Sequence, residues 1–72
     1  MELRLLRYFV AVAEELHFAR AAERLGVEQS PVSRAMRHLE ATLGVQLFDR
    51  SANQTRLTRA GQVFLGECRR VL

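Results

Sequence analysis

The 72-residue sequence has no lysine and no tryptophan, one proline and one cysteine. A single cysteine, Cys68, excludes an intrachain disulfide and fits a reducing compartment. Late in a helical segment, a lone cysteine is more often a core or interface residue than a redox sensor. No apolar run reaches the roughly 18 residues of a membrane-spanning helix, so we expect no membrane partner.

The amino-terminal residues also lack the pattern of a secretory signal peptide. The stretch MELRLLRYFVAVAEELHF mixes acids and arginines within an apolar helical period. A signal peptide instead has a basic start followed by an uninterrupted apolar stretch. We therefore expect a mature protein located in the cytoplasm.

Positive charge is concentrated in the second part of the chain. All eleven basic residues are arginines, against eight acids, and the sequence pI is about 10.4. Residues 1–28 hold four arginines and five glutamates, whereas residues 29–72 hold seven arginines and three acids. This excess predicts a polyanionic partner for the second part. Arginine side chains favour bidentate contacts with phosphate and guanine. Codon usage explains the exclusive use of arginine at least as well.

Apolar residues at helical spacing predict a core-building helix over residues 2–16. A second, short helix follows His17 and Phe18 and stops at Gly26, which can adopt the left-handed conformation. The pair Ser30-Pro31 predicts the start of a third helix, with Ser30 as its N-cap and proline at the first helical position. This helix is expected to end near Leu43, before Gly44.

The second and third helices carry a helix-turn-helix signature over residues 18–37. Ala22 is small where a second helix crosses closely, and Gly26 follows four residues later. Five further positions match the buried positions of the general pattern: Ala21, Leu25, Val27, Val32 and Ala35. Seven positions therefore agree, and the sequence predicts a DNA-reading motif.

The third helix has two opposite faces. Its apolar stripe, at spacing 4, 3, 4, consists of Val32, Met36, Leu39 and Leu43. The face turned away from the core carries hydroxyls and guanidinium groups: Ser30, Ser33, Arg34 and Arg37. Because its amino-terminal end also presents unpaired backbone amides, this face is expected to approach phosphate and bases.

Two short extended segments around a polar turn predict a β-hairpin at about residues 45–57. Leu47 or Phe48, together with Leu57, is expected to anchor it to the core, with Arg50, Asn53 and Arg56 near its tip. Thr58 predicts the N-cap of a last helix. That helix carries Val63, Phe64, Cys68 and Val71 along one expected apolar side.

No enzymatic site is expected. His17 and His38 lack metal-ligand spacing, and the pair Glu14-Glu15 is typical of a solvated helix face. The sequence contains no glycine-rich phosphate loop and no nucleophile motif. The sequence therefore predicts neither a metal nor a cofactor in this domain.

In order along the chain, these elements resemble the amino-terminal domain of LysR-type transcriptional regulators. The resemblance covers all 72 residues and rests on LRYFVAVAEELHFARAAERLGVEQSPVSRAMRHLEATLGVQLFDR and on LTRAG. It implies a mainly α fold with a small β-hairpin: a winged helix-turn-helix with a three-helix core, a wing and the start of a linker helix. The implied division is 1–58 for the DNA-binding domain and 59–72 for the linker helix, with the helix-turn-helix at about 18–43.

The resemblance also implies which residues read double-stranded DNA. The third helix would enter the major groove, and the wing would lie on the adjacent minor groove. The family's DNA-contacting stretch is matched by Gln29, Ser30, Pro31, Ser33 and Arg34. The glutamine, proline, serine and arginine side chains in it can each contact a base. Backbone contacts are expected from Arg37 or His38 and, beside the wing, from Arg50 and Arg56.

The chain departs from the family pattern at three places. Asn53 stands where the wing commonly has an arginine, which predicts a weaker or differently selective minor-groove contact. Ala19 replaces a frequent serine or threonine, removing a hydroxyl. At the third helix, Ser30 replaces a frequent proline and Glu28 a frequent serine, so an acid lies near the expected phosphate.

The family plan further implies a dimer or tetramer of the full-length protein on an inverted-repeat operator. Its linker helix makes dimers, and a carboxy-terminal domain binds a small effector. The expected dimer face in this chain consists of Phe64, Cys68 and Val71. Because this face has few helical turns, the chain alone is expected to be monomeric in dilute solution. The alternative function is a winged-helix protein-interaction module that does not bind DNA.

Overall fold

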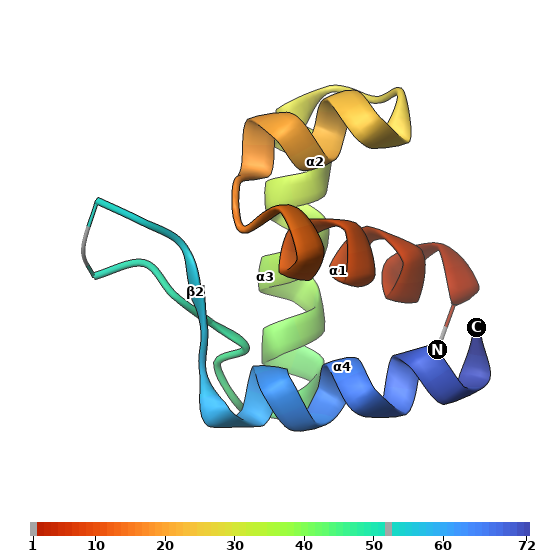
Figure 1. The fold of residues 1–72 in the computed structure, drawn as a ribbon, viewed down its shortest axis with the longest axis vertical. Coiled ribbons are helices and arrows are strands. Elements are labelled where there is room, and N and C mark those ends of the chain that lie inside the picture. Colours follow the sequence, from red (N-terminus) through yellow and green to blue (C-terminus); the bar gives the residue numbers. More distant parts are fainter. Residues whose placement is uncertain (1, 52) are drawn as a thin grey trace.

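A computed structural model describes residues 2–51 and 53–72. In order, its elements are α1 (Leu3–Glu15), α2 (Phe18–Leu25), α3 (Gln29–Leu43), β1 (Phe48–Asp49), β2 (Arg56–Leu57) and α4 (Arg59–Val71). α1 and α4 run in opposite directions, and the hairpin projects to one side of them (Figure 1). Position 1 of the expected domain and position 52 of the expected wing lie outside the described residues. The prediction of a mainly α fold with a small β-hairpin is confirmed.

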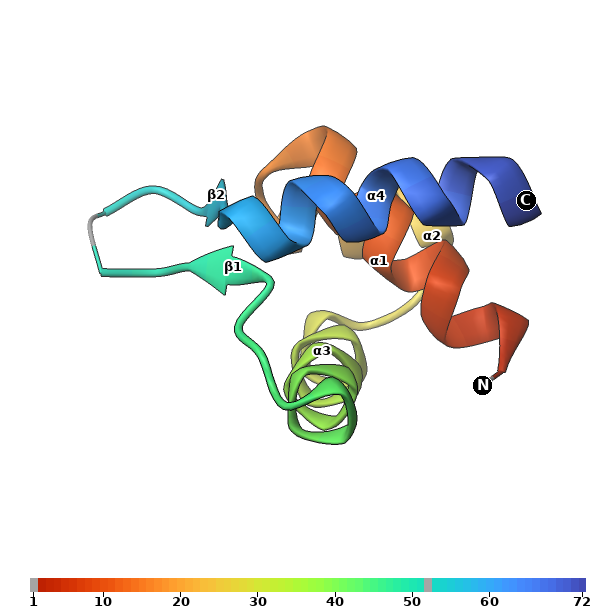
Figure 2. The same ribbon diagram turned by 90° about the horizontal axis from the view of Figure 1, so that it is seen from below.

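α3 lies at the edge of the helical core. Seen almost along its axis in Figure 2, α3 has the other three helices on one side and leaves its opposite side uncovered. Val32, Met36 and Leu39 are fully buried on the covered side, as predicted. Among the described residues, no helix has the length and apolarity needed to cross a membrane.

The predicted helix ends at Gly26 and Gly44 are confirmed. Both glycines have a φ of 72° and cap the helices before them, and the Gly44 N–H donates to the carbonyl of Glu40. At the start of α2, the Nδ1 atom of His17 accepts a hydrogen bond from the backbone N–H of Arg20 at 3.1 Å. α2 is therefore closed at both ends by local interactions.

The predicted start of α3 was wrong by two residues. Its N-cap is Glu28, in extended conformation and without a side-chain cap, and Gln29 and Ser30 are already helical. Pro31 is thus the third helical residue instead of the first. The helix tolerates this because N–H groups throughout the first turn lack an intrahelical acceptor, so proline removes no bond there.

A row of aromatic rings fills the centre of the core. Phe9 of α1 is fully buried, with its ring centroid 5.0 Å from that of Phe64 and 5.4 Å from that of Phe48. The Phe48 ring in turn lies 5.7 Å from the ring of Phe18. Tilted and edge-on aromatic pairs of this kind add specific packing to apolar burial. The row therefore joins α4, α1, β1 and α2.

Two predicted core positions were wrong. Val27 and Leu43 are each 37% exposed. Val27 lies in the turn after the Gly26 cap of α2, and Leu43 is the last residue of α3. On α4, Val63 and Val71 are exposed, whereas Leu65 and Cys68 are buried. The buried face of α4 follows Gly61 at intervals of four and three residues, which leaves Val63 and Val71 of the expected apolar side exposed.

The wing, residues 45–57, is an antiparallel hairpin with Phe48 opposite Leu57 and Asp49 opposite Arg56. Both Leu47 and Phe48 are buried, and Leu57 is half-buried. These side chains anchor the hairpin to the core, as predicted. A two-residue pairing gives a hairpin little stability of its own. The wing therefore depends on contacts with the helices.

Thr58 joins the wing to α4. Its Oγ1 donates to the carbonyl of Gln46 at 2.6 Å and accepts the backbone N–H of Gly61 at 3.0 Å, which confirms the predicted cap. Its own N–H donates to the carbonyl of Leu47 at 3.0 Å. A side chain at Gly61 would overlap this Leu47 carbonyl oxygen, so α4 needs glycine there to approach the wing.

Replacing Gly61 with alanine is expected to lower the free energy of unfolding by about 1–3 kcal/mol, because the new methyl group would force backbone apart. Gly66 is the matched control on the same helix, since an added methyl group there meets no atom within 4 Å. Gly66→Ala is expected to raise stability by roughly 0.5–1 kcal/mol. Urea denaturation measures both changes, and equal effects would contradict the close approach at Gly61.

Candidate nucleic-acid interface

The uncovered face of α3 carries most of the residues predicted to read DNA. Gln29, Ser30, Arg34, Arg37 and His38 are exposed, and Pro31 and Ser33 are half-buried. They extend along α3 from its first residue. The side of this helix away from the other three is uncovered (Figure 2). The predicted opposition of an apolar and a polar face on this helix is therefore present in the structure.

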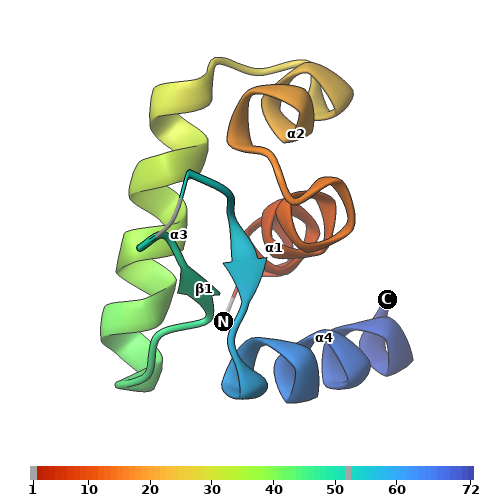
Figure 3. The same cartoon turned by 60° about the vertical axis from the view of Figure 1, so that its left-hand side comes forward.

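These residues divide between two shallow grooves. On one flank of α3, Pro31, Arg34 and His38 line a groove whose far wall includes Leu5 of α1. On the other flank, Ser33 and Arg37 line a groove shared with the wing, whose walls include Asn53 and Arg50. In Figure 3 the wing comes forward beside α3. The reading face is thus continuous from α1, over α3, to the wing.

Three arginines of this face form no ion pair with the described residues, although Arg56 lies opposite Asp49 in the hairpin and its charge helps to lower the pKa of that carboxyl. In residues 2–51 and 53–72, neither Arg34, Arg37 nor Arg56 forms an ion pair. Several arginines elsewhere are paired with glutamates, among them Arg24 and Arg69, whereas Arg7 and Arg59 form no ion pair with the described residues either. The net positive charge of the chain is therefore available where α3 and the wing are exposed, and this supports binding of a polyanion.

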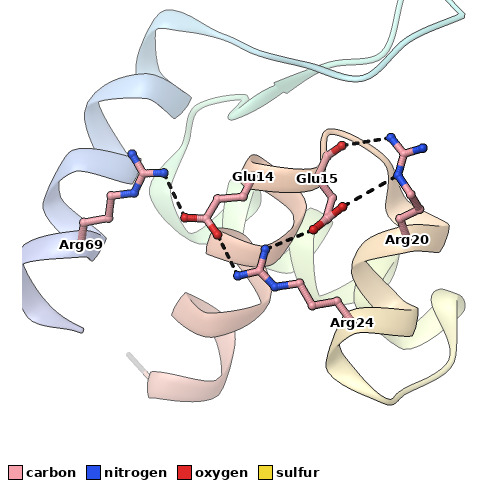
Figure 4. A network of polar contacts seen from close by, with 5 residues as sticks. All are labelled: Glu14, Glu15, Arg20, Arg24 and Arg69. Atoms are coloured by element: carbon pink, nitrogen blue, oxygen red, sulfur yellow. Dashed lines mark hydrogen bonds and ion pairs between the residues drawn. The ribbon is translucent and has the colours of Figure 1, made fainter.

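Figure 4 shows the paired arginines at the carboxyl end of α1. The Glu14 carboxylate accepts from Arg24 of α2 at 2.7 Å and from Arg69 of α4 at 3.0 Å. Glu15 pairs with Arg24 at 3.3 Å and with Arg20 at 3.8 Å. Acids at a helix carboxyl end oppose the helix dipole, so these cations offset an unfavourable placement while joining three helices.

Hydrogen bonds from Arg24 and Arg69 lower the pKa of Glu14 below its usual value of 4.5. The carboxylate consequently stays charged to a lower pH than an ordinary glutamate and holds both guanidinium groups. At the wing, the side-chain and backbone hydrogen bonds of Ser51 lower the pKa of Asp49. Both carboxylates accept hydrogen bonds from groups other than the exposed arginines of α3.

The wing is attached to α3 by Glu40. Its Oε2 accepts the backbone N–H groups of Leu47 at 2.8 Å and Phe48 at 3.1 Å. Its Oε1 accepts from the Arg50 guanidinium at 3.3 Å. The Glu40 side chain is only 11% exposed. The carboxylate therefore replaces water for two backbone donors at the base of the wing.

Arg50 is held by two aromatic rings as well as by Glu40. Its guanidinium carbon lies 5.4 Å from the Phe18 ring centroid and 5.7 Å from that of Phe48. Farther along the wing, Asn53 and Arg56 are exposed. Of the three wing residues predicted to contact DNA, Arg50 alone has internal partners among the described residues.

Sequence reasoning missed Glu40 and Phe18. Glu40 is one of three acids in the basic second part of the chain and lies beside the apolar stripe of α3, seven residues before Leu47. An acid at the border of a core stripe was the available signal. Nothing in the local pattern identified its partners, because they belong to another element.

The predicted dimer face is only partly exposed. Val71 is 66% exposed, Phe64 is half-buried against Phe9, and Cys68 is 2% exposed in the core of its own chain. Burial raises the pKa of the Cys68 thiol. The dimer interface stays a prediction, but the Cys68 side chain packs inward. In the part of the chain that is described, no three histidine, cysteine or acidic side chains gather as metal ligands.

A family model described as "Bacterial regulatory helix-turn-helix protein, lysR family" matches residues 3–62. The chain belongs to the LysR family. Among its relatives, the HTH-type transcriptional regulator ShiR of Corynebacterium glutamicum (strain R) is 54% identical over 72 residues. XapR of Escherichia coli (strain K12) is 54% identical over 71 residues. These alignments cover 100% and 99% of this chain and 24% of each relative, so the chain spans about a quarter of their length.

Two solved LysR-type domains bound to DNA have the same fold. The BenM DNA-binding domain in complex with catB site 1 DNA is 44% identical, with a TM-score of 0.94. The CbnR DNA-binding domain in complex with DNA is 52% identical, with a TM-score of 0.93. Each match covers 99% of this chain, and 79% and 82% of those chains respectively. The winged helix-turn-helix fold is thereby confirmed.

The Glu14 network predicts an acid-sensitive stability. Since the folded pKa of Glu14 is lowered, its contribution is present above pH about 4.5 and is lost as the pH falls through the lowered pKa. Because the side chain is 33% exposed, Glu14→Gln is expected to cost no more than about 1 kcal/mol at pH 7. The difference from the original chain should vanish in strong acid.

Thermal unfolding followed by circular dichroism between pH 2 and pH 7 measures this dependence. Glu67→Gln is the matched control, because Glu67 is 60% exposed and pairs only with Arg70 on its own helix. The control is expected to follow the original chain at every pH. A Glu14→Gln curve parallel to that of the original chain over the whole range would contradict the assignment.

Proposed function

We propose that this chain is the DNA-reading domain of a bacterial LysR-type transcriptional regulator and binds double-stranded DNA sequence-specifically. The supporting observation is that Arg34 and Arg37 of α3 are exposed and form no ion pair with any residue that the structure describes. The BenM and CbnR domains, which share the fold over 99% of this chain, are solved in complex with DNA. The exposed arginines, the fold and the related proteins thus all favour DNA as the partner, and none of them favours an enzyme.

In the proposed complex α3 enters the major groove. Gln29 reads an adenine edge, Pro31 contacts a thymine methyl group, and Arg34 reads guanine or holds phosphate. Ser30 and Ser33 bond to bases or phosphate at the same end of the helix. These assignments are supported by the exposure of Gln29, Ser30 and Arg34 and by the free backbone amides expected at the amino terminus of α3, while Pro31 and Ser33 are half-buried.

Farther along α3 and on the wing, the proposed contacts are to the DNA backbone. Arg37 and His38 lie at least one turn beyond Ser33, so they reach phosphate more readily than bases. Arg56 holds phosphate beside the wing. Asn53 lies at the minor groove, where its side chain is uncharged. This arrangement predicts weak discrimination of minor-groove width by the wing.

The rest of the proposed protein follows the family plan. α4 begins a linker helix through which the full-length protein forms a dimer or tetramer on an inverted repeat. A carboxy-terminal domain binds a small effector, while this domain needs no cofactor. The protein works in the cytoplasm at the nucleoid. The length of the relatives, four times that of this chain, supports a larger protein.

A selection experiment tests this function. The 72-residue chain is titrated across a salt series into a library of inverted-repeat duplexes with half-sites about one helical turn apart. Selective binding that weakens with salt is expected, since phosphate contacts release counterions. Salt-sensitive binding without sequence preference would contradict specificity in the isolated chain. No binding at low salt would favour a protein-interaction module.

Arg34→Ala is expected to cost roughly 1–3 kcal/mol of binding free energy on the selected duplex and to relax selectivity at one base pair. Its control is Arg70→Ala, at the far end of α4, where the arginine is paired with Glu67. Arg70→Ala should leave affinity nearly unchanged. Fluorescence anisotropy on the selected duplex and on single-base variants measures both. A uniform loss on every duplex would make Arg34 a phosphate contact.

A further inference from the structure

The base of the wing contains a carboxylate whose two oxygens are both occupied. Glu40 Oε2 accepts two backbone N–H groups, at 2.8 and 3.1 Å, and Oε1 accepts the Arg50 guanidinium. The two backbone donors belong to Leu47 and Phe48, which are at most 1% exposed. Buried donors without a partner are costly, so the carboxylate determines where these two residues can lie.

The charged guanidinium of Arg50 also interacts with groups of the protein itself. Its guanidinium lies over the rings of Phe18 and Phe48 while it pairs with Glu40. Stacking and a charged hydrogen bond together hold an arginine in one orientation. Arg37 and Arg56, by contrast, form no ion pair in the described ranges and are exposed. The three arginines near the wing groove therefore differ in availability.

The short hairpin cannot orient itself. β1 and β2 pair over only two residues each, so the direction of the wing relative to α3 must come from outside the sheet. Glu40 is the side chain of α3 that bonds to the wing backbone, and Arg50 continues that contact to α2 through Phe18. The distance between α3 and the wing decides whether both can engage neighbouring grooves of one duplex.

We propose that Glu40 and Arg50 form a clamp that sets the wing at a fixed position relative to α3, and that Arg50 acts on DNA binding as a positioning residue instead of a phosphate contact. The proposal rests on the proposed DNA-binding function. It assigns phosphate contact in this region to Arg37 and Arg56. It also gives the acid at position 40 a favourable role in binding a polyanion.

Glu40→Gln separates the two roles of Arg50 by the sign of its effect. If Arg50 binds phosphate, removing its competitor and a negative charge tightens DNA binding. If the clamp positions the wing, the same change weakens binding, and we expect a loss of roughly tenfold. The matched charge control is Glu28→Gln, since Glu28 is exposed and its side chain caps nothing. This control is expected to leave affinity unchanged or to tighten it.

Affinity is measured with the 72-residue chain by fluorescence anisotropy on a duplex carrying catB site 1, the DNA in the BenM complex. Tighter or unchanged binding by Glu40→Gln would overturn the clamp. Should Glu40→Gln fail to fold, Arg50→Lys tests the clamp through amide hydrogen exchange without DNA. It keeps the charge but loses the planar fork and the stacking, so the clamp predicts faster exchange at Leu47 and Phe48, and unchanged exchange there would overturn it.

Amide hydrogen exchange without DNA tests the clamp independently of function. Glu40→Gln is expected to speed exchange at Leu47 and Phe48 by about tenfold or more, with the amides of α1 unchanged. Unchanged exchange at both positions would overturn the clamp even if DNA binding weakened. One further outcome separates the two proposals. If the original chain binds no duplex and Glu40→Gln still speeds this exchange, the proposed function is wrong and the clamp is supported.

Discussion

The packing of Phe48 at the base of the wing is the contact on which the rest of the structure depends. Its ring lies between those of Phe9 and Phe18, which belong to α1 and α2. Its backbone N–H bonds to Glu40 of α3, and its strand partner is Leu57. One residue thereby connects the wing to three helices. Without it, a two-residue hairpin has no core to which it can attach.

The second organising constraint is where the charges are cancelled. Glu14 binds arginines of α2 and α4, so the cations on that side serve to hold helices together. On the uncovered face of α3, Arg34 and Arg37 have no such partner in the described ranges. A net charge of +3 is modest, but its local distribution creates a positive reading face.

Short-range features were predictable from the sequence, and packing-dependent ones were not. Gly26 and Gly44 were identified as helix ends because a left-handed residue follows from local backbone geometry. Val27 was wrongly placed in the core, since its exposure depends on how the chain passes from α2 to α3. Which face of α4 is buried depends likewise on packing, since this helix buries Cys68 and approaches the wing closely at Gly61.

The sequence by itself determined the helices, the hairpin, the family and the exposed arginines of α3, because helical periodicity, capping and turn chemistry act over a few neighbouring residues. Only the tertiary structure decided which charges remain available. Arg50 meets Glu40 across 10 residues, and Arg69 meets Glu14 across 55. Such pairs form only after the hydrophobic core has brought distant segments together, so no local pattern encodes them.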